Sequence, residues 1–256
     1  MKFGKKYISE VICIAQFKNI DVKIRHKIGD AEEAFKGMFP EQSQQTNVPD
    51  HFDPNQPRLI FHAGKKQLFI SQASCQLKLS FDHDDKDINS QFSIIKKNLA
   101  LFQNELTKFK SINEWNECAI VMNISIPSNE EKESILRHVY DNFFKTNTED
   151  EFGSLASISF KAGYKTKEKL YLNYEIDVYE LQKIEFSGPI PANQNILLDA
   201  KNLTMVERGI GVRLDINNRP KTESESYVYS GIDEFIPIVS EFFNKKIDKL
   251  LGVNNI

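Results

Sequence analysis

Cysteine is scarce in this sequence, and the few cysteines stand far apart. Only three occur in 256 residues, Cys13, Cys75 and Cys118, and no two of them have the Cys-x-x-Cys spacing. An odd number of widely spaced cysteines predicts neither a disulfide framework nor a zinc knuckle. We therefore expect three reduced and mostly buried thiols, as in a cytoplasmic protein.

A long apolar run is also missing. Lys18, Asp21 and Lys23 interrupt any such run after the basic start of the chain. No segment reaches the roughly 20 apolar residues that span a bilayer. The sequence predicts no membrane segment and no signal peptide, which favours the cytoplasm.

Charge of one sign is not in excess either. The chain has 33 Lys and Arg against 36 Asp and Glu, a formal net charge of −3. The basic footprint of a dedicated nucleic-acid binder is therefore absent, and nucleic acid is disfavoured as a partner. With 40% hydrophobic residues, the chain has enough apolar material for a sizeable core.

Several motifs that carry chemistry are lacking. No GxGxxG, GxxxxGK[ST] or GxSxG pattern occurs, and no two of the five histidines have metal-ligand spacing on one element. The acidic run from Asp82 to Asp87 lacks the glycine at its sixth position and the glutamate at its twelfth that an EF-hand needs. We expect no metal and no other cofactor.

What the sequence does contain is strand and helix periodicity in alternation. Strands are expected at 8–17, 58–71 (a hairpin) and 75–81, and then at 118–126, 155–162, 169–180 and 195–216. Apolar residues at spacings of three and four predict a long helix over 88–109. This helix fits best across a sheet, with a coiled-coil seam as the alternative. A final helix should begin near Asp233.

The order of these elements suggests two related parts. Each reads strand, helix, several antiparallel strands and long helix. We expect an α+β protein of two similar halves, residues 1–112 and 113–256, each an antiparallel sheet backed by a long helix. The halves could share one continuous sheet.

One metal-dependent nuclease class places an acid on one strand and acid-x-lysine on the next. Asp177 and the pair Asp199 and Lys201 have a permissive spacing for this chemistry, with the acids holding the metal and the lysine positioning water. Acid-x-lysine is common by chance in a chain with this much charge. These three residues are the candidate catalytic set, and exposed sheet positions explain them equally well.

Four tyrosines differ from the core aromatics: Tyr171 and Tyr179 fall on the polar side of their strand, and Tyr227 and Tyr229 lie in the segment before the last helix. Ordinary amphipathic surface positions would explain each one. Clustered, they would favour a protein interface or would cap a small-molecule cavity between sheet and helix. They are the candidate binding residues.

Four features together resemble a known family. They are Phe39-Pro40 after the first helix, the hairpin with its long following helix, the strand ending at 123–127, and the stretch from 212–217 to Phe242-Phe243. The chain resembles a sporadically distributed, uncharacterised family of bacterial proteins of about this length. The resemblance implies a bacterial cytoplasmic protein and carries over no catalytic residue.

The sequence favours a non-catalytic binding or protein-interaction module over an enzyme. A protein partner is expected, and self-association into a homo-oligomer is compatible with the pattern. The alternatives are the metal-dependent nuclease and a small-molecule carrier with a cavity between sheet and helix.

Overall fold

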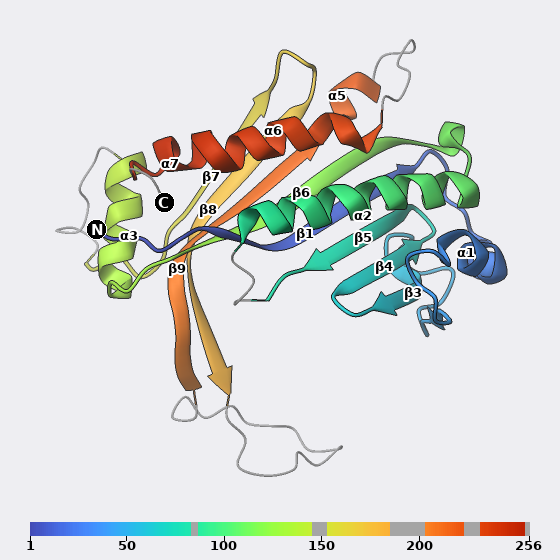
Figure 1. Ribbon diagram of the computed structural model, residues 1–256, viewed down its shortest axis with the longest axis horizontal. Helices are drawn as coiled ribbons and strands as arrows, with labels where there is room; N and C mark the ends of the chain where they lie inside the picture. Colours follow the sequence, from blue (N-terminus) through green and yellow to red (C-terminus); the bar gives the residue numbers. More distant parts are fainter. Residues whose placement is uncertain (83–86, 145–152, 185–202, 223–230, 254–256) are drawn as a thin grey trace.

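A computed structural model describes residues 1–82, 87–144, 153–184, 203–222 and 231–253. Its strands form one antiparallel sheet in the order β2-β3-β4-β5-β1-β6-β9-β8-β7 (Figure 1). The strands are β1 Tyr7–Phe17, β2 Gln44–Gln45, β3 Pro57–Ala63, β4 Lys66–Ser71, β5 Ser74–Ser80, β6 Trp115–Pro127, β7 Ser159–Lys165, β8 Tyr171–Ile184 and β9 Leu203–Asn217. The helices are α1 Ile28–Phe35, α2 Ile88–Phe109, α3 Lys132–Phe143, α5 Arg219–Thr222, α6 Phe235–Glu241 and α7 Ile247–Leu250.

The sheet is continuous from edge to edge. The predicted α+β class and the antiparallel pairing are confirmed. Of the two arrangements expected, the structure has the shared sheet, because β1 pairs with β6 along almost its whole length, from Tyr7 opposite Ser125 to Phe17 opposite Trp115.

The two long helical segments cover the same face of this sheet. Figure 1 shows α2 and the α6–α7 segment lying side by side in front of the strands. Apolar side chains alternate along the long strands, and the buried set packs with both helical segments in one core cluster. No helix within the described ranges is long and apolar enough to cross a membrane.

The helix α2 has the bounds that its apolar stripe predicts. Asp87 caps its start by accepting a hydrogen bond from the backbone N–H of Asn89 at 3.3 Å. Ile95, Leu99 and Phe102 are almost completely buried on its inner face. The helix therefore lies across the sheet, as the sequence favours, and its stripe is not left open for a coiled-coil partner.

A buried glutamine fixes α2 over the centre of the sheet. The pairing of β1 with β6 is interrupted between Ile8 and Glu10. The Gln91 amide lies beside this irregularity: its oxygen accepts from Ile8 N at 3.0 Å, and its nitrogen donates to Ile8 O at 2.9 Å. Unpaired buried backbone groups are costly, and the Gln91 side chain supplies hydrogen-bond partners to the backbone N–H and C=O of Ile8 beside the bulge.

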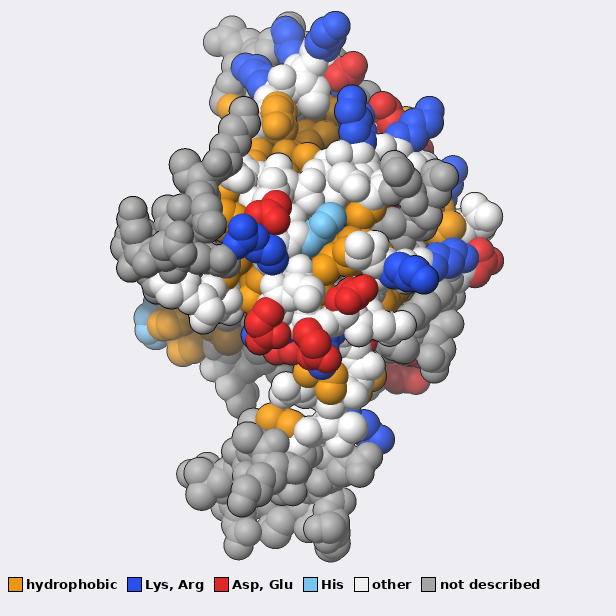
Figure 2. Space-filling model, turned by 90° about the vertical axis from the view of Figure 1, so that its left-hand side faces the viewer, with side chains coloured by type: hydrophobic (Ala, Val, Ile, Leu, Met, Phe, Trp, Pro, Cys, Tyr) orange, Lys and Arg blue, Asp and Glu red, His pale blue; other side chains and the backbone are white. Residues whose placement is uncertain are grey.

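The hairpin of β8 and β9 runs beyond the rest of the sheet. β6 pairs with β9 only from Gly209 to Asn217, so the start of β9 pairs with β8 alone (Figure 1). Figure 2 shows acidic side chains on the side of the molecule that lies at the left of Figure 1. Ion pairs join the start of α3 to the hairpin, since Glu131 pairs with Arg208 and Lys132 Nζ lies 3.1 Å from Glu180 Oε2.

Candidate functional site

The face of the sheet opposite the helices is the candidate site, and we call it the open face. Its side chains come from alternate strand positions, so cross-strand pairing sets them in rows. The central row runs Glu10, Asn123, Arg213, Glu175 and Lys161 across β1, β6, β9, β8 and β7.

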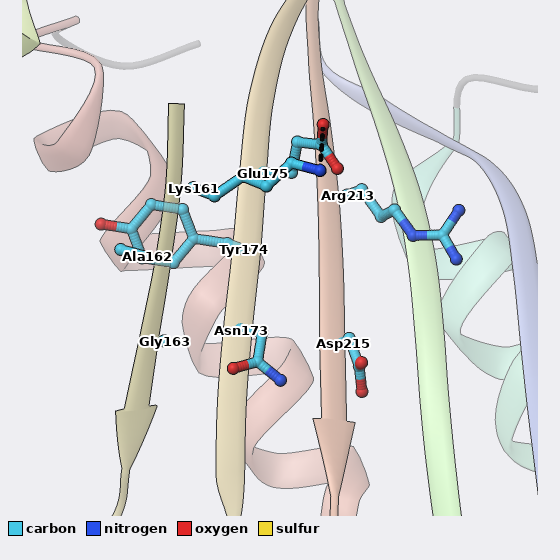
Figure 3. Close-up of a pocket in the computed structure, with 8 residues that line it drawn as sticks. All are labelled: Lys161, Ala162, Gly163, Asn173, Tyr174, Glu175, Arg213 and Asp215. Atoms are coloured by element: carbon cyan, nitrogen blue, oxygen red, sulfur yellow. Dashed lines mark ion pairs between the residues drawn. The ribbon is translucent and has the colours of Figure 1, made fainter. Parts of the chain in front are cut away.

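Arg213 is the unpaired charge of this row. Glu10 pairs with Lys78 on one side, and on the other Glu175 Oε1 lies 3.0 Å from Lys161 Nζ. Arg213 is exposed and makes no ion pair or hydrogen bond within the described part of the chain. Figure 3 shows its guanidinium extending over β6, away from the Glu175–Lys161 pair. Five donor hydrogens are thus left for a ligand.

Three hollows of the open face meet at Arg213. One of about 350 Å³ lies toward β7 and includes Lys161, Gly163, Asn173 and Asp215. A second of about 330 Å³ includes Ser125, Glu175, Asp177, Tyr179 and Gly211. A third of about 330 Å³ lies over β1 and β6 and includes Ile14, Val121, Asn217 and Arg219. They are open depressions along one surface and have Arg213 in common.

The third hollow has an apolar floor between two arginines. Ile14 of β1 and Ala119 and Val121 of β6 supply its apolar lining, and Arg213 and Arg219 also line it. Arg219 Nε lies 3.1 Å from Glu117 Oε1, whereas Arg213 is unpaired there. The combination suits a contact that buries apolar surface and neutralises one positive charge.

Asp177, one of the candidate catalytic residues, lies in the second hollow. It stands opposite Gly211 in the β8–β9 pair, and a β-carbon at position 211 would overlap its carboxylate. The pKa of Asp177 is raised, first by partial loss of solvent around the carboxyl and then by repulsion from Glu175.

The rest of the nuclease set cannot be placed around Asp177. Asp199 and Lys201 lie outside the described residues, as do residues 83–86 of the acidic run. Among the described residues no group of three or more His, Cys, Asp or Glu side chains could hold a metal ion. The nuclease site stays a prediction from the sequence.

Tyr179, a candidate binding residue, is tied to a buried carboxylate. Its hydroxyl donates to Glu207 Oε1 at 2.6 Å, and the hydroxyl of Tyr7 donates to the same oxygen at 2.7 Å. Burial and the Glu207 carboxylate raise the pKa of Tyr7 to about 12 and raise that of Tyr179 as well. The hydroxyl hydrogen of Tyr179 is thus engaged within the β8–β9 hairpin, and the hydroxyl of Tyr7 joins the start of β1 to the same carboxylate.

The other three tyrosines do not join Tyr179. Tyr171 lies eight residues earlier on β8, half-buried and opposite Asn217 of β9. Tyr227 and Tyr229 lie outside the described residues. The two described tyrosines share the open face but stand at opposite ends of it.

Sequence reasoning did not single out Arg213. The alternation of 210–216 does place it on the polar side of its strand, together with Gly211 and Asp215. That alternation does not show that the carboxylates of the central row, Glu10 and Glu175, already form ion pairs with lysines.

Comparison with known proteins found no match: no family model, no curated protein and no solved structure is similar to this chain.

Proposed function

We propose that this protein is a non-catalytic interaction module that binds a partner protein on the open face of its sheet. The observation that carries the proposal is Arg213, an exposed guanidinium without an ion pair in the described part of the chain, where three hollows meet. The partner would present a carboxylate to Arg213 and apolar side chains to the floor beside it.

The composition of the surface supports a protein partner. Arginine beside apolar surface is typical of the energetic centre of protein interfaces, with paired charges around it. Here Ile14 and Val121 supply the apolar part, and the paired Lys161–Glu175 and Arg219–Glu117 groups supply the rim. The hollows are open and shallow, whereas small-molecule sites usually enclose most of their ligand.

A small-molecule carrier with a cavity between sheet and helices is less well supported. The space beneath α2 and α6 holds large side chains that are almost fully buried, among them Phe35, Phe102, Phe235 and Phe243. The hollows around Arg213 lie on the opposite face.

We also propose that the chain consists of two similar halves and that the protein is located in a bacterial cytoplasm. The strand order β3-β4-β5-β1 beside β6-β9-β8-β7, each set backed by a long helical segment, supports a chain of two similar halves, 1–112 and 113–256. A bacterial cytoplasm follows only from the family resemblance.

The test is capture of partners from the native cell extract with three forms of the chain. Arg213→Glu reverses the charge of the proposed centre. Lys36→Glu is the matched control, because Lys36 is a highly exposed residue near α1, away from the open face. A protein retained by the wild type and by Lys36→Glu but lost with Arg213→Glu supports the proposal. Equal retention by Arg213→Glu would place the contact elsewhere.

A further inference from the structure

The two edges of the sheet differ in whether other segments of the chain cover them. At one edge, β2 and the loop before β3 cover the outer side of β3. Gln44 pairs with Ile60, and the backbone N–H of Thr46 donates to Arg58 O at 3.0 Å. The Thr46 hydroxyl donates to Pro57 O at 2.7 Å. This edge is not available for another strand.

Two arginines hold that covering loop in place. Arg25 Nε lies 2.7 Å from Asp50 Oδ1, and the Nε of the fully buried Arg58 lies 3.5 Å from the same oxygen. Arg58 also donates to Gln56 O at 2.6 Å and to Pro49 O at 3.1 Å. Covering loops of this kind prevent edge-to-edge association.

The opposite edge, β7, has no such cover among the described residues. It pairs with β8 on one side and is the last strand of the sheet. Five of its seven residues are exposed. Its pairing with β8 runs without a bulge from Ser159 to Lys165, and it contains no proline. A straight strand of this length is a template for a further strand.

The side chains of β7 separate into two kinds. Ser159, Lys161, Gly163 and Lys165 lie on the open face. Phe160, Ala162 and Tyr164 lie on the helix side, where Phe160 stacks on Phe143 at 4.3 Å and the more exposed Tyr164 stacks on Tyr174 at 6.0 Å. A strand added here should match apolar with apolar and leave no lysine opposite a lysine.

We propose that β7 pairs in antiparallel fashion with β7 of a second copy of this chain, centred on Ala162. In this register Phe160 faces the partner's Tyr164, so aromatic side chains meet across the strands. Lys165 faces the partner's Ser159, and Lys161 faces the partner's Gly163. The interface is isologous and closes as a dimer, because the other edge of each copy is covered.

Neighbouring registers are less favourable. Directly opposed residues must share a face, so the centre can move only by whole residues along β7. A centre at Lys161 would oppose that lysine to its own copy. A centre at Gly163 would oppose Lys161 to the partner's Lys165. Like charges directly opposite destabilise a strand pair, which leaves Ala162 as the centre.

The contact area of one seven-residue strand pair is small. Interfaces well below about 1,000 Å² support only weak or transient association. We therefore expect a dimer that forms in the range of about 10 μM to 1 mM. The proposal does not depend on the binding role of Arg213.

Sedimentation equilibrium of the full chain tests the proposed dimer. Two substitutions, at positions that face each other in this register, first weaken and then restore the pairing. Ser159→Lys places lysine opposite the partner's Lys165 at two symmetric sites and should weaken the dimer roughly 2- to 30-fold. Adding Lys165→Glu turns both sites into opposite-charge pairs and should restore it. Within one chain, Glu175 lies beside position 159, so a lysine there is tolerated by the fold.

Cross-linking checks the register by a second route. The three native cysteines are buried, so Ala162→Cys supplies a thiol at the proposed centre, on a half-buried position of the edge strand. Mild oxidation should join two copies through position 162, whereas Lys167→Cys, two residues beyond the strand, should give little dimer. A chain that stays monomeric up to about 1 mM overturns the proposal. So does a dimer that is indifferent to Ser159→Lys and to the rescue.

Discussion

Lys110 Nζ lies 2.8 Å from Asp21 Oδ2, although the two residues are 89 positions apart in the chain. The pair joins the end of α2 to the loop after β1, and Lys27 Nζ contacts the same oxygen at 2.7 Å. Lys110 is almost fully buried and also lies over the ring of Phe17. One carboxylate therefore pairs with two lysines beside the core, and Glu114 Oε1 lies 3.7 Å from Lys110 Nζ as a second negative charge.

Asp21→Asn should lower the free energy of unfolding at pH 7 by about 2 kcal/mol. Hydrogen bonds from Lys110 and Lys27 outweigh partial desolvation and lower the pKa of Asp21 to about 2. A carboxyl with a depressed folded pKa stabilises above its unfolded value of about 4, and this stabilisation disappears as pH falls from about 4 to 2. Urea unfolding of both forms should therefore differ at pH 7 and converge near pH 2. Glu33→Gln, at a highly exposed site, is the control; an equal gap at both pH values would contradict the assignment.

Tyr7→Phe should destabilise the chain by about 1–2 kcal/mol, because it removes a hydrogen bond to the buried Glu207 carboxylate. The pKa of Tyr7 is raised to about 12. A group with a raised folded pKa contributes stability below the unfolded value of about 10, and that stability is lost as pH rises from 10 to 12. Tyr179 and Tyr174 also have raised pKa values, so a late phase of the absorbance titration of phenolate remains in both forms. Its amplitude should be smaller by one tyrosine in Tyr7→Phe than in the wild type, and an unchanged amplitude would contradict the assignment to Tyr7.

Gly211→Ala should destabilise the chain by at most about 1 kcal/mol, since its β-carbon would overlap the end of the exposed Asp177 side chain, which must turn away. Asp177→Ala removes the obstacle, so the double variant should recover most of the loss. Thermal unfolding of the two single variants and the double variant measures the coupling between the sites. Additive effects would show that the obstruction comes from elsewhere.

Arg58→Ala should lower the free energy of unfolding by about 2–5 kcal/mol, because it leaves the backbone carbonyls of Gln56 and Pro49 without their donor and removes a fully buried side chain. The loop of residues 41–57 should become sensitive to protease before the rest of the chain unfolds. Limited proteolysis with mass spectrometry locates the first cut. Arg213→Ala is the matched control and should leave both stability and cutting pattern nearly unchanged, because Arg213 is exposed and makes no hydrogen bond or ion pair within the described part of the chain.

Local pattern predicted individual elements well. The stripe of apolar residues predicted a helix over 88–109, and α2 spans Ile88–Phe109. The alternation of 75–81 predicted a strand, and β5 spans Ser74–Ser80. The final helical segment begins with a 3₁₀ turn at Ile232, next to the predicted start at Asp233, but its π-helical stretch at Phe242–Lys246 was not foreseen. These successes rest on periodicities that involve only neighbours in the chain.

The candidate site could not be predicted in the same way. Tyr179 was chosen as a binding residue from its polar side of a strand, yet its hydroxyl hydrogen goes to Glu207, which is distant in the sequence. Arg213 became a candidate only when the register of five strands placed it between Glu10 and Glu175, each already paired with a lysine.

The sequence by itself determined the α+β class, the antiparallel strands, the long helix and the lack of common nucleotide and hydrolase motifs, because composition and short-range periodicity fix these properties. Tertiary structure alone decided that β1 and β6 join all strands into one sheet, that one edge is covered and β7 is not, and which charged side chains are neutralised. Those outcomes depend on pairing between segments far apart in the chain, which local pattern does not encode.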